Sequence, residues 1–327
     1  MSGFNNRYVG IVKESTYGTD PTSGYVFGEV DDESIKHTYE VMQRTDMSRY
    51  GTAKSNTGKE FSEGDINMAM LPDNFLGTVL TGLFPTDTVT GSSPTYTHTF
   101  TEAGTDRSFT MLVGREEKEH TYTGIAVDSM SVSANINEYA MISASFMGKA
   151  ESALANIGAS SPAFNTADPL YFADAKVFFN GDSTASNLVK SISFDINMNR
   201  DGDNACGLGD ATYTRLPPFQ RREISGSIEF NKIVHTAAES EPTYAELTSA
   251  DGLELKGSGI ELKVQFGDES TADVLTFNFY KIRFEAPDAN VSGRDTQTMT
   301  VPFIALFSPD DSKMMDVVMK NSASGAY

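Results

Sequence analysis

Few side chains in this sequence could do catalytic chemistry. Histidine is the residue best suited to proton transfer near neutral pH, and the chain has four histidines, His37, His98, His120 and His235. None of them is spaced with cysteine or carboxylates as in a zinc site. The sequence also lacks a Gly-x-Ser-x-Gly elbow, a Gly-x-x-x-x-Gly-Lys phosphate loop and a dinucleotide fingerprint. We therefore predict no enzyme activity, no catalytic residue and no cofactor, and we place the histidines on strand surfaces or in loops.

One acidic loop superficially resembles a calcium site. The segment Asp201–Asp210 (DGDNACGLGD) has three aspartates among glycines, but the distal bidentate glutamate of a calcium loop is missing. Clusters of Gly, Asp and Asn are ordinary turn chemistry, so we favour a turn over a metal site. Cys206, the single cysteine, lies in this loop without a basic neighbour that would activate it. One cysteine also excludes an intrachain disulfide.

Charge and composition narrow the class of protein. The 327 residues carry 45 Asp and Glu against 25 Lys and Arg, a formal net charge of −20, which repels phosphate and argues against tight nucleic-acid binding. Hydrophobic residues make up 39% of the chain, which is enough for packed globular domains. No stretch reaches the ~18 apolar residues of a membrane helix, and the first residues do not form a signal peptide. We expect a protein that is made in the cytoplasm and has no membrane contact.

Alternation of apolar and polar residues predicts a β-rich fold. Within Val189–Asn199, four apolar residues alternate with polar ones, and Arg222–Asn231 repeats the pattern. These two strands are expected to pair across the long loop between them. A short helix at 242–250 and strands at 260–266, 275–286 and 296–307 complete this half. Pro302 is expected at a sheet edge or a bulge.

The first half shows the same order of elements. Strands are predicted at 33–44 and 59–71, with a polar loop over 45–57 between them. A helix is predicted over 72–84, because its apolar residues share one helical stripe; they are Phe75, Leu76, Val79, Leu80 and Leu83. Further strands are predicted at 96–101, 108–113, 121–134 and 139–149.

The shared order indicates an internal repeat of one strand, loop, strand, helix, strand, strand unit. The final strands align, with Met141 matching Met299. The stretch between the halves is small, polar and contains proline, as a linker does. We predict a first β domain at 1–155 with an N-terminal arm at 1–28, a linker at 156–169, and a second β domain at 170–327.

Three stretches carry a resemblance to a known family. Phe219–Ile228 (FQRREISGSI) follows the long loop and precedes the short helix and the last strands. In the first half, Tyr122–Ser152 contains a strand that begins Gly-Ile-Ala-Val and another that ends Phe-Met-Gly-Lys, and Val9–Pro21 (VGIVKESTYGTDP) stands near the start. These features resemble the major tail tube proteins of long-tailed bacteriophages, and the resemblance spans nearly the whole chain.

The resemblance implies a mainly β fold of two tandem sandwich or barrel domains, each with a short flanking helix. In this family, hairpin strands of successive subunits join around a channel, and two-domain members form trimeric rings with pseudo-sixfold symmetry. The weak second helix, the unequal loops and Pro302 leave a hexamer of one larger domain open. Stacked rings would form the virion tail, assembled in the host cytoplasm. The implied partners are further copies of the chain, the tape measure protein, the tail terminator and the distal tail or baseplate proteins, with DNA only in non-specific transit.

Strand alternation and loop position select the candidate residues. The lumen-facing hypothesis covers seven polar strand residues, which are Glu63, Asp65, Asn67, Asp195, Asn197, Asn199 and Glu229. Their negative and amide groups would let DNA slide past without capture. The loops at 45–57 and 201–220 would contact the next ring or the neighbouring subunit, and the residues assigned to these contacts are Arg49, Tyr50, Lys54, Leu208, Tyr213, Arg215, Arg221 and Arg222. For Arg221 and Arg222 the alternative is a solvated charge beside a strand.

Other functions remain open at this stage. A different virion component would share much of the pattern. A carbohydrate-binding or adhesin-type β-sandwich would use Tyr- and Asn-rich loops, although the chain has no Trp to serve as a platform. A hydrolase on a β scaffold would need paired carboxylates that the sequence does not place. The tail tube ranks first among these hypotheses.

Overall fold

The protein is mainly β, with two α-helices and one large antiparallel sheet. The computed structural model describes residues 7–48, 50–157, 162–165, 167–238, 240–248, 260–269, 273–289 and 297–327. The first half contains β1 (Tyr8–Lys13), β2 (Val26–Gly28), β3 (Asp32–Glu33), β4 (Lys36–Thr45), β5 (Thr52–Ala69), α1 (Asn74–Leu83), β6 (Thr86–Ser92), β7 (Thr95–Thr101), β8 (Phe109–Arg115), β9 (Lys118–Asn135), β10 (Met141–Gly148) and β11 (Glu151–Asn156). The second contains β12 (Ala175–Phe179), β13 (Val189–Asn197), β14 (Glu223–Phe230), α2 (Tyr244–Thr248), β15 (Ile260–Phe266), β16 (Val274–Phe284), β17 (Met299–Ala305) and β18 (Met315–Asn321), with 3₁₀ turns at Phe172–Asp174 and Asp203–Ala205.

The two halves share one order of strand pairing. In the first half neighbouring strands follow the order β4-β5-β10-β9-β8-β1. In the second half the order is β13-β14-β17-β16-β15-β12. In addition, β11 pairs with the beginning of β9, and β18 pairs with the beginning of β16. Each strand of one series therefore has a counterpart in the other.

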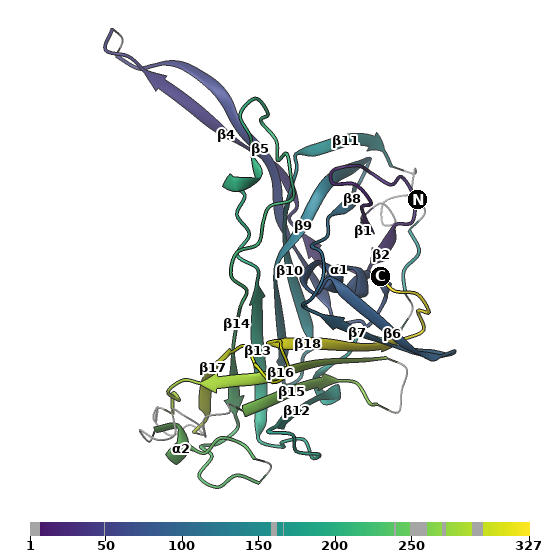
Figure 1. Cartoon of the computed structure of the whole chain (residues 1–327), viewed down its shortest axis with the longest axis vertical. Helices are drawn as coiled ribbons and strands as arrows, with labels where there is room; N and C mark the ends of the chain where they lie inside the picture. The colour runs from purple at the N-terminus through teal and green to yellow at the C-terminus, as the bar shows by residue number, and fades with distance from the viewer. Residues whose placement is uncertain are drawn as a thin grey trace.

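A strand-to-strand joint makes the sheet continuous between the halves. The last part of β9, Ser129–Asn135, pairs with β13 on one edge while β10 occupies the other. Figure 1 shows β13 and β14 running along the long axis beside β9 and β10, with β15, β16 and β18 crossing below them. A second contact joins β18 to β7 of the first half.

Helix α1 packs in the part of the hydrophobic core that the first half contributes. Asp73 caps the helix, because its carboxylate accepts a hydrogen bond from Leu76 N at 2.8 Å. All five residues of the predicted stripe are buried, which confirms the predicted helix. Any side chain at Gly28 would meet the Phe75 ring at 2.5 Å, so glycine lets β2 approach the helix closely.

In the second half, the core is formed by aromatic side chains more than by the helix. Phe194 makes edge-to-face contacts with Phe277 and Phe279, at centroid distances of 5.0 and 5.2 Å, an arrangement that aromatic quadrupoles favour. In α2 only Leu247 is buried. The alternation predicted for 189–199 is confirmed, because its four apolar residues all lie in the core.

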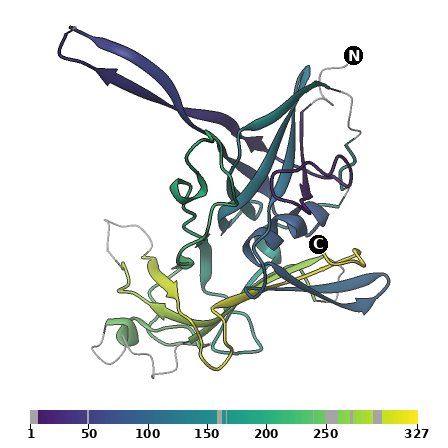
Figure 2. The same cartoon turned by 45° about the horizontal axis from the view of Figure 1, so that its top comes forward.

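The predicted loop over 45–57 is wrong. Strands β4 and β5 pair as far as Thr45 and Thr52, so only a short turn separates them. The outer part of this hairpin, residues 39–58, projects away from the body and is called the arm below (Figure 2). Nearly every described residue of the arm is exposed. A strand that is exposed on both faces has no apolar alternation, and so the sequence pattern did not reveal it.

The predicted N-terminal arm needs correction. The segment at 1–28 is not a free arm from Arg7 onward, because β1 pairs with β2 and β8 and buries Val9 and Ile11. Strand β11, at the end of the predicted first domain, lies on the edge of β9.

Strand β17 pairs with β14 on one side and with β16 on the other. The pairing with β16 ends at Phe284 opposite Phe303, so Pro302 lies at the edge of β17 on that side, as predicted. Its carbonyl accepts a hydrogen bond from Glu285 N at 2.8 Å, and the proline has no N–H to donate in return. The predicted match of Met141 with Met299 is out of register. Met141 is half-buried on the side of the sheet that faces away from the core, whereas Met299 is fully buried in the core.

Candidate interaction surfaces

One face of the large sheet is polar across both halves. The side chains that alternate with the core residues on β5, β10, β9, β13 and β14 form this surface, called the polar face below. Met141 and Met147 of β10 also lie on it. Its polar members are Glu63, Asp65, Asn67, Ser129, Ser131, Ser133, Ser143, Ser145, Ser191, Ser193, Asp195, Asn197, Glu223, Ser225, Ser227 and Glu229. All of these residues are exposed or half-buried.

The strand registers place these residues in rows that cross the joint. Asn67 lies opposite Ser143, which lies opposite Ser131. Ser131 in turn lies opposite Asp195 on β13, and Asp195 opposite Ser225 on β14. Directly opposed residues on adjacent strands have neighbouring Cβ atoms on the same side of the sheet. The polar face is thus one surface and not two separate patches.

Short polar side chains hold the carboxylates in place. The Ser131 hydroxyl donates to Asp195, and the Ser145 hydroxyl donates to Asp65. On the other side of the joint, the Ser193 and Ser227 hydroxyls are 3.2 Å apart. Serine hydroxyls and carboxylates offer no large apolar surface and no positive charge, so the middle of this face has little to hold a polyanion.

The cations that touch this face lie toward strand ends. Lys36 Nζ is 3.5 Å from Glu63 Oε1, and Lys190 Nζ is 2.8 Å from Glu229 Oε1. The hydrogen bond from Lys190 lowers the pKa of Glu229. Both ion pairs are partly exposed and contribute little to stability. Their effect is to neutralise the rim while the centre keeps the charge of Asp65 and Asp195.

Six of the seven lumen-facing candidates lie together on the polar face. The exception is Asn199, which follows the end of β13, has a positive φ of 49° and donates from Nδ2 to Arg221 O. The serines of β9 and β10 were not among the predicted residues. Their alternation could have revealed them, because Ser129, Ser131 and Ser133 alternate with Met130 and Val132.

The arm carries unusually exposed apolar side chains. Met47 and Tyr50 at its tip are fully exposed, and Val41 and Met42 are more than half exposed. Large apolar residues gathered on a projecting element indicate a contact surface. Lys54 is exposed beside them, whereas Arg49 lies outside the described residues.

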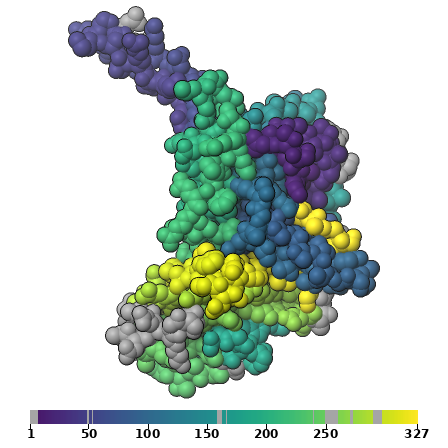
Figure 3. Space-filling view, viewed as in Figure 1, coloured from purple at the N-terminus to yellow at the C-terminus, as the bar shows by residue number. Residues whose placement is uncertain are grey.

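The long loop at 201–220 packs against its own chain, at the base of the arm. Ala211 O accepts from Glu60 N at 2.8 Å, and the Tyr213 ring stacks on Phe61 at 6.0 Å. Lys59 Nζ is 2.6 Å from Asp203 Oδ1, and this hydrogen bond raises the pKa of Lys59. In the space-filling view of Figure 3 the green loop reaches up to the purple-blue base of the arm.

This packing changes the predicted contact residues. Tyr213 is only 2% exposed, so the prediction that it contacts another subunit is wrong. Arg215 is exposed and donates to Asn204 O within the loop. Leu208 is fully exposed at the loop tip, as an intersubunit contact requires.

Two arginines of the second half are held by the first half. Arg222 donates to Leu83 O at 2.6 Å and lies 3.1 Å from Glu102, so it forms an ion pair within its own chain, which neither of the two alternatives for this residue included. Arg200 is buried and makes a two-pronged contact with Asp106 at 2.6 and 2.7 Å. Arg221 remains exposed, with Glu223 at 3.9 Å.

The carboxylates of the acidic loop are engaged in turn hydrogen bonds. Asp201 accepts from Asn204 N at 3.0 Å, and Asp210 accepts from Thr212 N at 2.9 Å. These hydrogen bonds lower the pKa of both carboxyl groups. Among the described residues, no group of three or more His, Cys, Asp and Glu side chains could hold a metal ion. Burial raises the pKa of the Cys206 thiol, so a smaller fraction of the thiol is present as the reactive thiolate.

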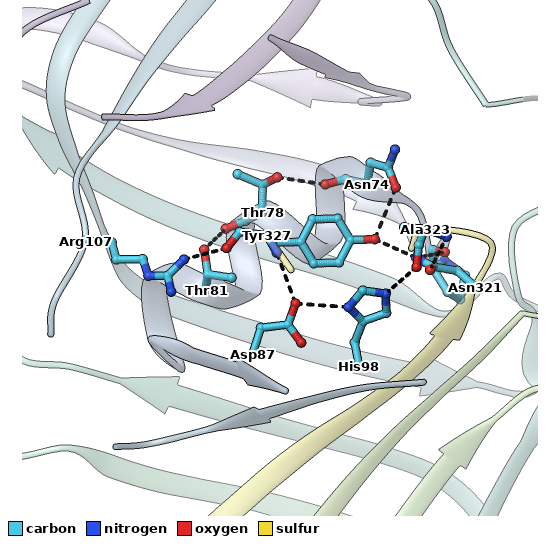
Figure 4. A network of polar contacts seen from close by, with 10 residues as sticks. Asn74, Thr78, Thr81, Asp87, His98, Arg107, Asn321, Ala323 and Tyr327 are labelled. Carbon is cyan, nitrogen blue, oxygen red and sulfur yellow. Dashed lines mark hydrogen bonds and ion pairs between the residues drawn. The ribbon is translucent and has the colours of Figure 1, made fainter. Parts of the chain in front are cut away.

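His98 is buried, contrary to the prediction of a strand surface or a loop. Figure 4 shows its ring between the Asp87 carboxylate and Ala323 O, each 3.0 Å away. Tyr327 packs against it at a centroid distance of 4.8 Å, donates from N to Asp87, and receives a hydrogen bond from Arg107 at its carbonyl. The network fixes the last residues beside α1.

Comparison with known proteins identifies the family. The family described as phage tail tube protein matches residues 5–305. This match covers nearly the whole chain, and the chain therefore belongs to the phage tail tube protein family. A search of curated proteins gave no match. In the part of the chain that the structure describes, no helix is long and apolar enough to cross a membrane.

Proposed function

We propose that this chain is the non-enzymatic building block of a bacteriophage tail tube. Copies of the chain form rings, the rings stack, and DNA passes through the resulting channel during ejection without being captured. The protein acts in the virion tail after assembly in the host cytoplasm. Its partners are other copies of itself, the tape measure protein, the tail terminator and the distal tail or baseplate proteins.

The polar face is the observation that carries this proposal. Its opposite side packs the hydrophobic core, with Ile192, Phe194 and Ile196 all buried. A sheet with one solvated face that continues unbroken from the first half into the second is suited to line a channel. Serine hydroxyls on this face can exchange hydrogen bonds with water, and its carboxylates repel phosphate.

The recurrent strand order supports two tandem domains. Each half supplies an equivalent set of strands, and the β9–β13 joint already connects two such sets side by side. Three chains would provide six sets, which gives a trimeric ring with pseudo-sixfold symmetry. A ring of six chains is the alternative, and the number of chains per ring distinguishes the two.

The arm is proposed to connect successive rings. It extends β4 and β5 beyond the end of β10 at Gly148, which pairs with Ser62. The opposite end of the same sheet, at the β9–β10 turn, carries the exposed apolar residues Ile136 and Tyr139. Apolar surfaces at both ends along the strand direction suit end-to-end stacking.

Negative-stain electron microscopy of the concentrated purified protein tests the proposal. We expect hollow tubes with a regular axial repeat. A stable monomer that binds glycans would support the adhesin-type alternative instead.

The channel lining has its own test. Asp65→Lys with Asp195→Lys should still give tubes, but these tubes should retain DNA that unmodified tubes release, because the variant replaces repulsion with attraction. Asp310→Lys, at an exposed loop position, is the matched control and should not retain DNA. Equal DNA retention by the two variants would contradict a channel role for the polar face.

A further inference from the structure

We propose that His98 is a pH-operated latch. Its imidazole ring carries a proton on each nitrogen, and in this state it fixes residues 322–327, which follow β18, against the first half of the chain. Loss of one of these protons at alkaline pH releases the segment. The proposal goes beyond the proposed function, because it concerns the closure of a single subunit and does not depend on assembly.

The ring of His98 lies between two hydrogen-bond acceptors (Figure 4). Nδ1 is 3.0 Å from Asp87 Oδ2, and Nε2 is 3.0 Å from Ala323 O. A carbonyl oxygen and an ionised carboxylate only accept hydrogen bonds, whereas a neutral imidazole has a single N–H. A neutral ring would therefore leave one of the two contacts without a proton. Because imidazole is more basic than a carboxylate, the second proton belongs to the ring.

Burial makes the second proton necessary. The side chains of His98 and Asp87 are both fully buried. The other carboxylate oxygen, Asp87 Oδ1, meets no hydrogen-bond donor among the described residues. A buried carboxylate without a counter-charge is costly, so the positive charge of the ring stabilises Asp87 as well as the segment. Together the two side chains form a buried pair without net charge.

The side chains that flank the ring on its own sheet are apolar. Val89 on β6 and Met319 on β18 lie directly opposite His98, so their side chains lie beside the ring on the same side of the sheet. The Phe100 ring stacks on it at a centroid distance of 6.2 Å. Asp87 is therefore the carboxylate that balances the charge of the ring.

Three further charged side chains lie around the segment. Arg107 donates to Tyr327 O at 2.6 Å, and its positive charge also acts on Asp87. Burial and the charge of Arg107 lower the pKa of Lys13. Burial first, and then the charge of Asp73, raise the pKa of the Tyr327 phenol, so this phenol stays neutral. Arg107 supports Asp87 electrostatically, but the hydrogen bonds to Asp87 Oδ2 come from the ring and from Tyr327 N.

The held segment fastens the second half to the first. It continues from β18, which pairs with β16 of the second half and with β7 of the first. Tyr327 N donates to Asp87 Oδ2 at 3.0 Å, and the Tyr327 ring packs on His98 at a centroid distance of 4.8 Å. The same ring lies on α1, where any side chain at Gly77 would meet it at 2.5 Å. The pair thus holds the segment at two points, Ala323 and Tyr327.

Loss of the second proton destabilises this contact. A neutral ring can donate to Ala323 O or to Asp87 but not to both, and the buried carboxylate then needs water, which reaches it when the segment moves away. Above about pH 6.5, where an exposed histidine is neutral, the held segment binds one more proton than the released segment. A rising pH therefore favours release.

Solid-state NMR of the sedimented chain, labelled with ¹⁵N in its histidines, tests the protonation. At pH 7.5 both ring nitrogens of His98 should be protonated, and the signals of His98 are those that His98→Gln lacks. His235 is the reference in the same spectrum, because it is exposed and exposed histidines are mostly neutral at this pH. A neutral His98 ring at pH 7.5 would overturn the proposal.

Hydrogen exchange measured by mass spectrometry tests the release. Between pH 7 and pH 9.5 the protection of residues 322–327 should fall about tenfold or more, relative to β13 as the internal standard. Asp87→Asn should abolish this fall, because a neutral ring can accept from the amide and still donate to Ala323 O. His120→Gln is the matched control, because His120 contacts Glu151 at 3.0 Å, outside the latch; it should behave like the unmodified chain.

The outcomes separate the latch from the function. Equal protection of the segment at the two pH values in the unmodified chain would overturn the latch, and so would an undiminished fall in Asp87→Asn. The NMR measurement on the unmodified chain decides the charge of the ring even where a variant does not fold. Both measurements apply to monomers and tubes alike, so their failure would leave the tail tube function standing.

Discussion

The hairpins β4–β5 and β13–β14 occupy equivalent places in the two halves but differ at their ends. The first extends into the exposed arm, whereas the second opens into the loop at 201–220, which folds back onto the base of that arm. The framework of paired strands is therefore repeated, and the connections carry the specialised contacts. One connection projects away from the body, and the other packs against its base.

The two helices show the same asymmetry. Helix α1 buries nine residues, whereas α2 buries only Leu247. The second half is in turn fastened to the first by Arg200 and Arg222, which reach across to Asp106 and Glu102. The first half should be the more stable, and the coupling of the second half should depend on these arginines.

The largest expected change is a loss of stability when the Arg200 contacts are removed. Arg200→Ala leaves Asp106 without its partner and removes the hydrogen bonds to Val127 O and Pro217 O. Breaking a buried ion pair costs about 3–5 kcal/mol, and chemical denaturation of the monomer measures it. Arg221→Ala is the control, because Arg221 is exposed and its loss should change the free energy of unfolding by about 0.5 kcal/mol or less. Equal effects of the two substitutions would refute the fastening role.

Substitutions at the tip of the arm are expected to have an intermediate effect, on assembly and not on stability. Met47→Ser with Tyr50→Ser removes the two most exposed apolar side chains of the arm, so it should leave the stability of the subunit unchanged. It should raise the critical concentration for assembly about tenfold, equivalent to about 1.4 kcal/mol, as light scattering would show. Leu208→Ser makes the same kind of change on the loop at 201–220 and should have less effect. A stronger effect of Leu208→Ser would reverse the roles assigned to the two connections.

A further prediction concerns the pH dependence of the cap of α1. Burial raises the pKa of Asp73 to about 6. Because this pKa lies above that of the unfolded carboxyl, the stabilisation linked to this proton is present below about pH 4 and is lost as the pH rises through 6. Asp73→Asn keeps a good cap and removes the titration, so the free energy of unfolding should change less between pH 4 and 6. Unchanged pH dependence in denaturation curves would contradict the raised pKa.

Sequence alternation was informative where a strand has one buried face. It predicted β13, β14 and the placement of Asp65 and Asp195 on one surface, because core packing forces every second residue inward. The family resemblance then connected this surface to a channel.

The remaining features depend on contacts between distant segments. The arm has no buried face, so its strands left no pattern. Tyr213 and Arg222 are polar residues near loops, and only the fold shows that Phe61 and Glu102 cover them. His98 likewise lies in the core because its ring is hydrogen-bonded to Asp87 and Ala323, which are distant from it in sequence.

Helical reconstruction of the assembled tube by electron microscopy tests the central claim most directly. We predict three chains per ring, with Asp65, Asp195 and the serines between them facing the axis. A tube whose inner wall is formed by another surface, with this one turned to the outside, would contradict it.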